Sequence, residues 1–89
     1  QDITREQLAA ILYRYAQLKG YDTSKRADLS AYTDAGDISA YALEAMQWAV
    51  AEELISGVTS YTLVPGGRAD RAQVAMILMR FCERIVPAE

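Results

Sequence analysis

The sequence predicts an all-α fold, and three observations lead to this prediction. Two segments, one at each end of the chain, carry apolar residues at the three-to-four-residue spacing of an amphipathic helix. Each of them follows a helix-capping sequence. A third segment between them is rich in small apolar residues. We therefore expect three main helices, over about 5–18, 39–53 and 71–86, joined by long loops.

The two end segments are copies of one another. Residues 4–15 reappear as 70–81, so that Arg5 and Arg71 occupy the same place in the two copies, and six of the twelve aligned residues are identical. Such self-similarity is the mark of a repeat architecture. The segment between the copies occurs once, so the chain holds about one and a half repeats and is expected to be a piece of a longer protein.

The first and third helices are predicted from their capping residues and from their apolar stripes. Thr4 with Gln7, and Asp70 with Gln73, each have the spacing of a capping box, so the helices should begin near Arg5 and at the equivalent position 71. Gly20 should end the first helix as a left-handed cap. The expected buried stripes are Leu8, Ile11, Leu12 and Tyr15 in the first copy and Val74, Ile77, Leu78, Phe81 and Ile85 in the second.

The middle helix should begin at an N-cap, either Ser39 or Asp37, and end near Glu53. Trp48 falls one step off the apolar stripe of this helix, so we expect it at the edge of the interface with its indole N–H seeking a partner. In the loop that follows, Pro65-Gly66 predicts a type II turn. The expected buried stripe is Ala42, Ala45, Met46, Ala49 and Val50.

Composition excludes several classes of function. The chain has 89 residues, a formal net charge of −3 and nine scattered Lys and Arg, which argues against nucleic-acid binding. Apolar runs are too short for a membrane span, so no membrane insertion is expected. Histidine is absent and Cys82 is the only cysteine, so no catalytic residues, no metal site and no cofactor are expected, and the protein is predicted not to be an enzyme. Cys82 should be a small buried thiol, the alternative being an intermolecular disulfide.

The position of Arg5 and Arg71 is unusual, because a cation at the first position of a helix opposes the helix dipole. One explanation is that each Arg joins the amides of the helix start in holding an anion such as a carboxylate or phosphate. The other is that each Arg lies along the surface or pairs with an Asp such as Asp34. The residues alone leave both open.

An ordered set of motifs resembles the S-layer homology (SLH) domain. It begins with Tyr32-Thr33-Asp34 and continues through Ala45-Met46-Gln47-Trp48-Ala49 and Leu54-Ile55-Ser56-Gly57. It then passes through Leu63-Val64-Pro65 to Arg71-Ala72-Gln73 and an amphipathic helix. On this resemblance residues 32–86 are one complete repeat, 1–19 are the closing motif and helix of a preceding repeat, and 20–31 are a linker.

The resemblance implies a non-catalytic module of a secreted protein at the bacterial cell surface. Its partner would be secondary cell wall polysaccharide bearing pyruvate ketals, bound in grooves between repeats that pack around a pseudo-threefold axis. Carried over by position, Arg5 and Arg71 would contact the ketal carboxylate, Asp34 and Gly57 would shape the groove, and Trp48 would pack beside it.

Two departures from the family pattern modify this expectation. Asp70 stands where the family usually has Thr and places a negative charge beside Arg71, so Arg5 is the better single contact. One and a half repeats are also fewer than the usual three, so we expect homo-oligomers or neighbouring repeats of a longer chain to supply the missing faces. The rival function is a self-association or protein-binding module on an SLH scaffold that has lost glycan binding.

Overall fold

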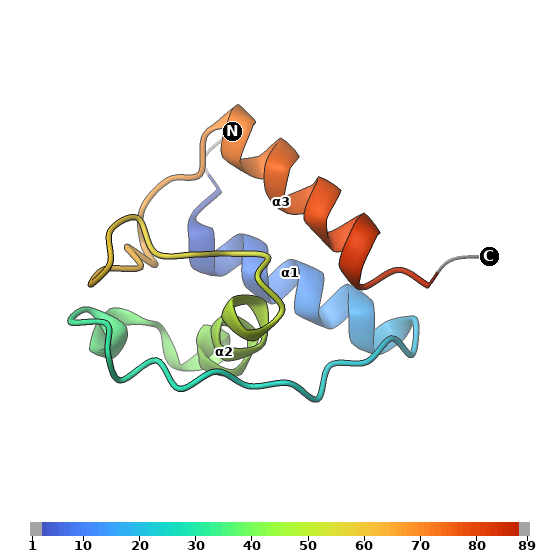
Figure 1. The fold of residues 1–89 in the computed structure, drawn as a ribbon, viewed down its shortest axis with the longest axis horizontal. Coiled ribbons are helices and arrows are strands. Elements are labelled where there is room, and N and C mark those ends of the chain that lie inside the picture. The colour runs from blue at the N-terminus through green and yellow to red at the C-terminus, as the bar shows by residue number, and fades with distance from the viewer. Residues whose placement is uncertain (1–2, 88–89) are drawn as a thin grey trace.

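The computed structural model describes residues 3–87 and is helical, which confirms the all-α prediction. Two α-helices of equal length, α1 and α3, run roughly side by side, and a shorter helix, α2, packs under α1 (Figure 1). Two short 3₁₀ turns, η1 and η2, lead into α2. The bounds are α1 Arg5–Leu18, η1 Ala35–Asp37, η2 Ala40–Ala42, α2 Leu43–Ala51 and α3 Arg71–Arg84.

Local capping fixes where the repeated helices begin. The Thr4 side chain accepts from the Gln7 amide in α1, and Asp70 accepts from the Gln73 amide in α3, with the reciprocal glutamine bond present in both. Gly20 follows α1 with a φ of 75°, as expected of a left-handed residue. α1 has the predicted bounds, and α3 ends at Arg84, two residues before the predicted end.

The middle helix differs from its prediction. Instead of one helix over 39–53, the chain forms the 3₁₀ turn η2 and then α2, which ends at Ala51. Neither candidate cap acts as one: Asp37 belongs to η1, and the Ser39 side chain makes no capping bond. The Ser39 amide and hydroxyl donate instead to Glu6 at the start of α1. A contact across 33 residues therefore replaces the local cap.

The core lies between α1 and α2 and continues to the inner face of α3. Trp48 is fully buried at its centre, with ring centroids 5.5 Å from Tyr13 and 6.4 Å from Phe81. The prediction that Trp48 lies at an edge was wrong, and its Nε1 has no hydrogen-bond partner among the described residues. The buried apolar residues are Leu8, Ala9, Leu12, Ala16, Leu29, Ile38, Ala42, Ala45, Met46, Trp48, Ala49, Leu54, Ile55, Leu63, Ala69, Ile77, Phe81 and Ile85.

Several members of the predicted stripes are not buried. Ile11 and Tyr15 of α1 are 56% and 46% exposed, and Leu78 of α3 is 42% exposed. Val50 is only partly buried. Cys82 is exposed, so the expectation of a buried thiol was wrong. Each repeated helix therefore buries one part of its apolar surface and leaves another part open.

The long connection after α1 crosses the outside of α2 (Figure 1). Its main anchors are the Ala27 amide, which donates to the Gln47 carbonyl at 3.0 Å, and the buried side chain of Leu29. Asp22 and Asp28 accept hydrogen bonds from serines two residues later and form local turns. The predicted linker 20–31 is thus packed against the repeat that it precedes.

Candidate functional site

Arg5 is a buried clamp on a distant loop. Its side chain is 7% exposed, and its guanidinium donates from Nε to the Leu63 carbonyl at 2.9 Å and from Nη2 to the Ser56 carbonyl at 2.6 Å. Burial lowers the pKa of Arg5 from its ordinary value, because removal from water disfavours the charged form. The planar fork of an Arg suits this double contact, which joins the start of α1 to residues 56–63.

Asp34 holds the same loop from its other side. Its carboxylate accepts from the Leu63 amide at 2.9 Å and from the Val64 amide at 2.8 Å. The Leu63 amide contributes most to lowering the pKa of Asp34, since hydrogen bonds to the charged form favour it. The amide of Leu63 is therefore bound by Asp34 and its carbonyl by Arg5.

Gly57 lies where this loop folds back on itself and passes close to Tyr32. A Cβ atom at this position would stand 3.0 Å from the Thr62 carbonyl oxygen and 3.0 Å from Cε1 of Tyr32. Only glycine fits so tight an approach of backbone to backbone. Three of the five predicted site residues, Arg5, Asp34 and Gly57, thus meet at residues 56–64, which we call the clamped loop.

The start of α1 is covered by the chain itself. The Arg5 amide donates to the Gly67 carbonyl at 2.9 Å, and the Glu6 amide donates to the Pro65 carbonyl at 3.0 Å. These two amides were expected to help hold an anion, and they are occupied. The turn that covers them closes with a bond from the Gly67 amide to the Val64 carbonyl. The positive φ in this turn belongs to Val64 and not to Gly66, so the prediction of a type II turn was wrong.

Arg71, at the equivalent place in α3, has the opposite environment. Its side chain is exposed and forms no hydrogen bond or ion pair with the described residues. The amides of Arg71 and Ala72 likewise have no partner within residues 3–87. The neighbouring Asp70 carboxylate accepts from the Gln73 amide at 2.8 Å. The start of α1 is therefore covered by the turn at residues 64–67, whereas the start of α3 is open.

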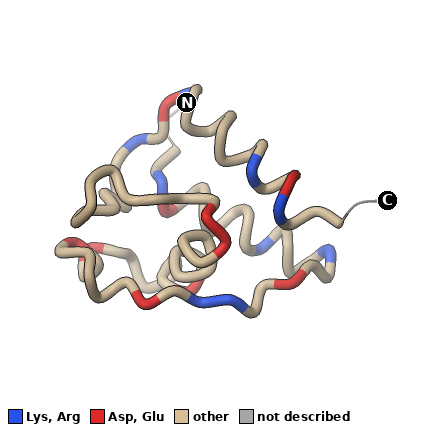
Figure 2. The backbone as a smooth tube through the Cα atoms, in the orientation of Figure 1, with Lys and Arg blue, Asp and Glu red and all other residues tan. Residues whose placement is uncertain are grey.

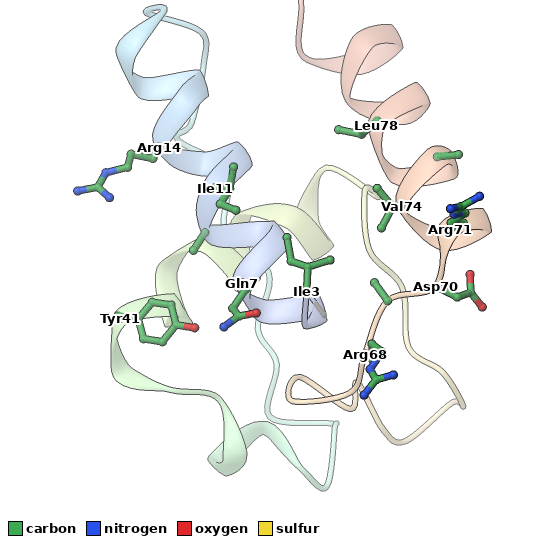
Figure 3. Close-up of a pocket in the computed structure, with 13 residues that line it drawn as sticks. Ile3, Gln7, Ile11, Arg14, Tyr41, Arg68, Asp70, Arg71, Val74 and Leu78 are labelled. Atoms are coloured by element: carbon green, nitrogen blue, oxygen red, sulfur yellow. The ribbon is translucent and has the colours of Figure 1, made fainter. Parts of the chain in front are cut away.

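A groove with a volume of about 1320 Å³ separates α1 from α3 (Figure 3). Its walls are apolar along most of their length, and Arg14 and Arg71 lie at opposite margins with their side chains pointing away from each other. Arg68, Asp70 and Tyr41 also line it. The apolar residues of the walls are Ile3, Ala10, Ile11, Ala69, Val74, Ala75 and Leu78.

Trp48, the last predicted site residue, lies in the core and reaches neither the groove nor solvent. The contact that sequence reasoning missed is Glu6, which is 8% exposed and accepts from the Ser39 amide at 2.9 Å and from its hydroxyl at 2.6 Å. No local spacing pattern connects Glu6 with Ser39 in the sequence. The one sequence feature that singles out Glu6 is its position in the first turn of a helix, where a negative charge is favoured.

Other kinds of site find no support in the described part of the chain. No group of His, Cys, Asp and Glu residues within 3–87 could hold a metal ion. Among the same residues, none of the helices has the length and apolar character needed to cross a membrane.

Comparison with known proteins identifies the family. The family model of the S-layer homology domain matches residues 31–75, half of the chain, including Asp34 and the whole clamped loop with Gly57. The chain belongs to the S-layer homology family. Comparisons with curated proteins and with solved structures gave no match. SLH domains are binding modules that attach proteins to the cell surface through cell wall polysaccharide, so this chain is a cell-wall anchoring module.

Proposed function

We propose that this SLH module binds pyruvylated secondary cell wall polysaccharide and that Arg71 holds the ketal carboxylate. The observation that carries the proposal is the open start of α3, where an exposed guanidinium adjoins two backbone amides without partners in the described chain. An Arg fork matches a carboxylate, and helix-start amides favour negative charge.

The surroundings of Arg71 also favour an acidic ligand. The module carries a net charge of −3, yet Arg68 also lines the groove beside Arg71, with Asp70 as its acidic residue. Basic and acidic residues stand close together where α1 and α3 begin (Figure 2). Tyr41, on the α1 side of the groove, offers an aromatic face for a sugar ring.

The other predicted site residues take supporting roles in this proposal. Sequence reasoning favoured Arg5 over Arg71, and burial reverses that order, because Arg5 would have to leave two carbonyls to reach a carboxylate. Asp34 and Gly57 shape the clamped loop, and Trp48 fills the core behind it. Arg5 is thus a positioning residue rather than a direct contact.

The same proposal assigns the parts of the chain. We infer that residues 32–86 form one repeat, that 1–19 close a preceding repeat, and that 20–31 connect them, although residues 1 and 2 lie outside the described part. The module acts without catalysis, in the extracellular space at the bacterial cell surface.

Titration calorimetry with purified pyruvylated polymer tests the proposed contact. We expect Arg71→Ala to weaken binding by about 1.5–3 kcal/mol, the typical value of a charge-assisted hydrogen-bond set. Asp70→Thr should strengthen binding, because it removes the neighbouring negative charge and keeps an N-cap. Lys19→Ala, which removes an exposed cation at the other end of α1, is the matched control and should bind as the unmodified module does.

Depyruvylated polymer supplies the second control. It should bind the unmodified module and Arg71→Ala equally weakly, since the carboxylate is then missing. Equal affinities of the two proteins for the pyruvylated polymer would refute the role of Arg71.

Self-association is kept as a second candidate function because one observation favours it. The groove between α1 and α3 is apolar over most of its length, and exposed Ile11 and Leu78 line it. Large apolar surfaces of this kind mark sites of interaction between proteins.

A further inference from the structure

A second pocket lies on the opposite side of α3 from the groove. It has a volume of about 370 Å³, which is within the range of small-ligand pockets. Its lining combines two arginines, one acidic residue, two residues with hydroxyl groups and two apolar residues. These are Arg80 and Arg84, Glu53, Tyr32 and Ser56, and Val50 and Ile55. None of them lines the groove, so the pocket is a separate cavity.

Arg80 gives this pocket an unpaired positive charge. The other arginine, Arg84, is bound to Glu53, with 3.0 Å between Nη1 and Oε1. Arg80 is half-buried and makes no hydrogen bond or ion pair with residues 3–87. A half-buried guanidinium has lost part of its hydration without gaining a partner in the described chain, so it favours an anion that can reach it.

The other residues of the pocket suit a sugar ring. The hydroxyl groups of Tyr32 and Ser56 have no hydrogen-bond partner among the described residues. Arg5 holds the backbone carbonyl of Ser56 at 2.6 Å, which fixes this residue in place and leaves its hydroxyl available. The Tyr32 ring and the apolar side chains of Val50 and Ile55 supply the surface on which the apolar face of a sugar can pack.

We propose that this pocket binds a sugar unit that carries a carboxylate or a phosphate, and that Arg80 holds the anionic group. The Tyr32 ring packs against the sugar ring, and the Ser56 hydroxyl hydrogen-bonds to a sugar hydroxyl. Nine residues make about two and a half helical turns, so Arg71 and Arg80 lie on opposite sides of α3, about 14 Å apart along its axis. Arg80 can therefore bind its anion whether or not Arg71 contacts a pyruvate ketal.

Titration followed by ¹H–¹⁵N NMR tests the site, because each backbone amide and each Arg Nε–H gives its own signal. The probes are glucuronate, glucose 6-phosphate and neutral glucose. We expect an acidic sugar to shift the signals of the Ser56 amide and the Arg80 Nε–H to saturation, and glucose to bind roughly tenfold more weakly or worse, because it lacks the charge. The acidic sugar that binds more tightly identifies the anionic group as a carboxylate or a phosphate.

Three substitutions test the role of Arg80, with the Ser56 amide signal as the measure of binding. Arg80→Gln should weaken binding roughly tenfold or more, because it removes the charged donor. Glu53→Gln should strengthen binding, because it releases Arg84 from its ion pair and adds a second available cation. Arg14→Gln makes the same change at the equivalent position of α1, outside the pocket, and should leave binding unchanged. A well-dispersed amide spectrum checks that each variant stays folded.

Three results would each overturn the proposal. They are the absence of saturable shifts at Ser56 and Arg80 with either acidic sugar, equally tight binding of glucose, and an affinity that Arg80→Gln leaves unchanged. Shifts of the Arg71 and Ala72 amides report on the glycan contact instead, so the failure of one proposal is distinguishable from the failure of the other.

Discussion

At the scale of single residues, the same motif residue does different work in its two copies. Arg5 donates to the Ser56 and Leu63 carbonyls of the clamped loop, whereas Arg71 is exposed. The sequence identified both residues as unusual, because a cation at a helix start needs a reason. It could not show that Arg5 binds two backbone carbonyls. These carbonyls lie 51 and 58 residues away along the chain, and only the folding of the loop brings them to Arg5.

Asp34 leads to a prediction about pH. Its carboxylate is hydrogen-bonded in the folded state, so its folded pKa lies below the ordinary value of 3.8. The stabilisation from these bonds is therefore fully present above pH 3.8 and is lost as the pH falls through the lower, folded pKa. Asp34→Asn has no such titration. We expect the unmodified module to be more stable than Asp34→Asn at neutral pH and this difference to shrink in acid.

Urea unfolding at a series of pH values measures this difference. Asp37→Asn is a suitable control, because Asp37 is exposed and makes no side-chain hydrogen bond with the described residues. A difference between the unmodified module and Asp34→Asn that is constant down to the acid limit would show that the Asp34 carboxylate does not hold the loop as a charged group.

At the scale of elements, the sequence predicts a helix boundary well where local hydrogen bonds set it, and poorly where contacts between distant residues set it. α1 and α3 could be predicted closely because their capping boxes span three residues. The start of α2 could not, because Ser39 is bonded to Glu6 and not to its own helix. The burial of Trp48 was missed for a similar reason, since Tyr13 and Phe81 cover it from the other two helices.

The hydrogen bonds between Ser39 and Glu6 can be tested by a double-mutant cycle that measures the free energy of unfolding. If the two side chains bind each other, Ser39→Ala and Glu6→Gln should each destabilise the module, and their effects should be coupled by about 0.5–3 kcal/mol. An ordinary N-cap at Ser39 would instead give no coupling to Glu6. Asp70→Ala, which removes a true N-cap, should lower stability by about 1 kcal/mol and add independently to either change.

At the scale of the whole molecule, the two copies of the repeated helix bury opposite faces. The open face of α1 and the open face of α3 correspond to surfaces that the other copy of the helix buries. The sequence predicts that both repeated helices carry apolar stripes in search of a partner. It could not indicate which face each helix buries, since the apolar stripes of the two helices look alike and only packing distinguishes them.

The central claim is that the repeated Arg is a structural clamp in α1 and a ligand contact in α3. It is tested most directly by measuring both urea unfolding and binding to pyruvylated polymer for Arg5→Ala and Arg71→Ala. We expect Arg5→Ala to lower the free energy of unfolding by about 1.5–3 kcal/mol, because the two carbonyls lose a charged donor. Arg71→Ala should leave unfolding within about 0.5 kcal/mol of the unmodified module and weaken binding at least tenfold. Unchanged stability with lost binding for Arg5→Ala, and unchanged binding for Arg71→Ala, would contradict the claim.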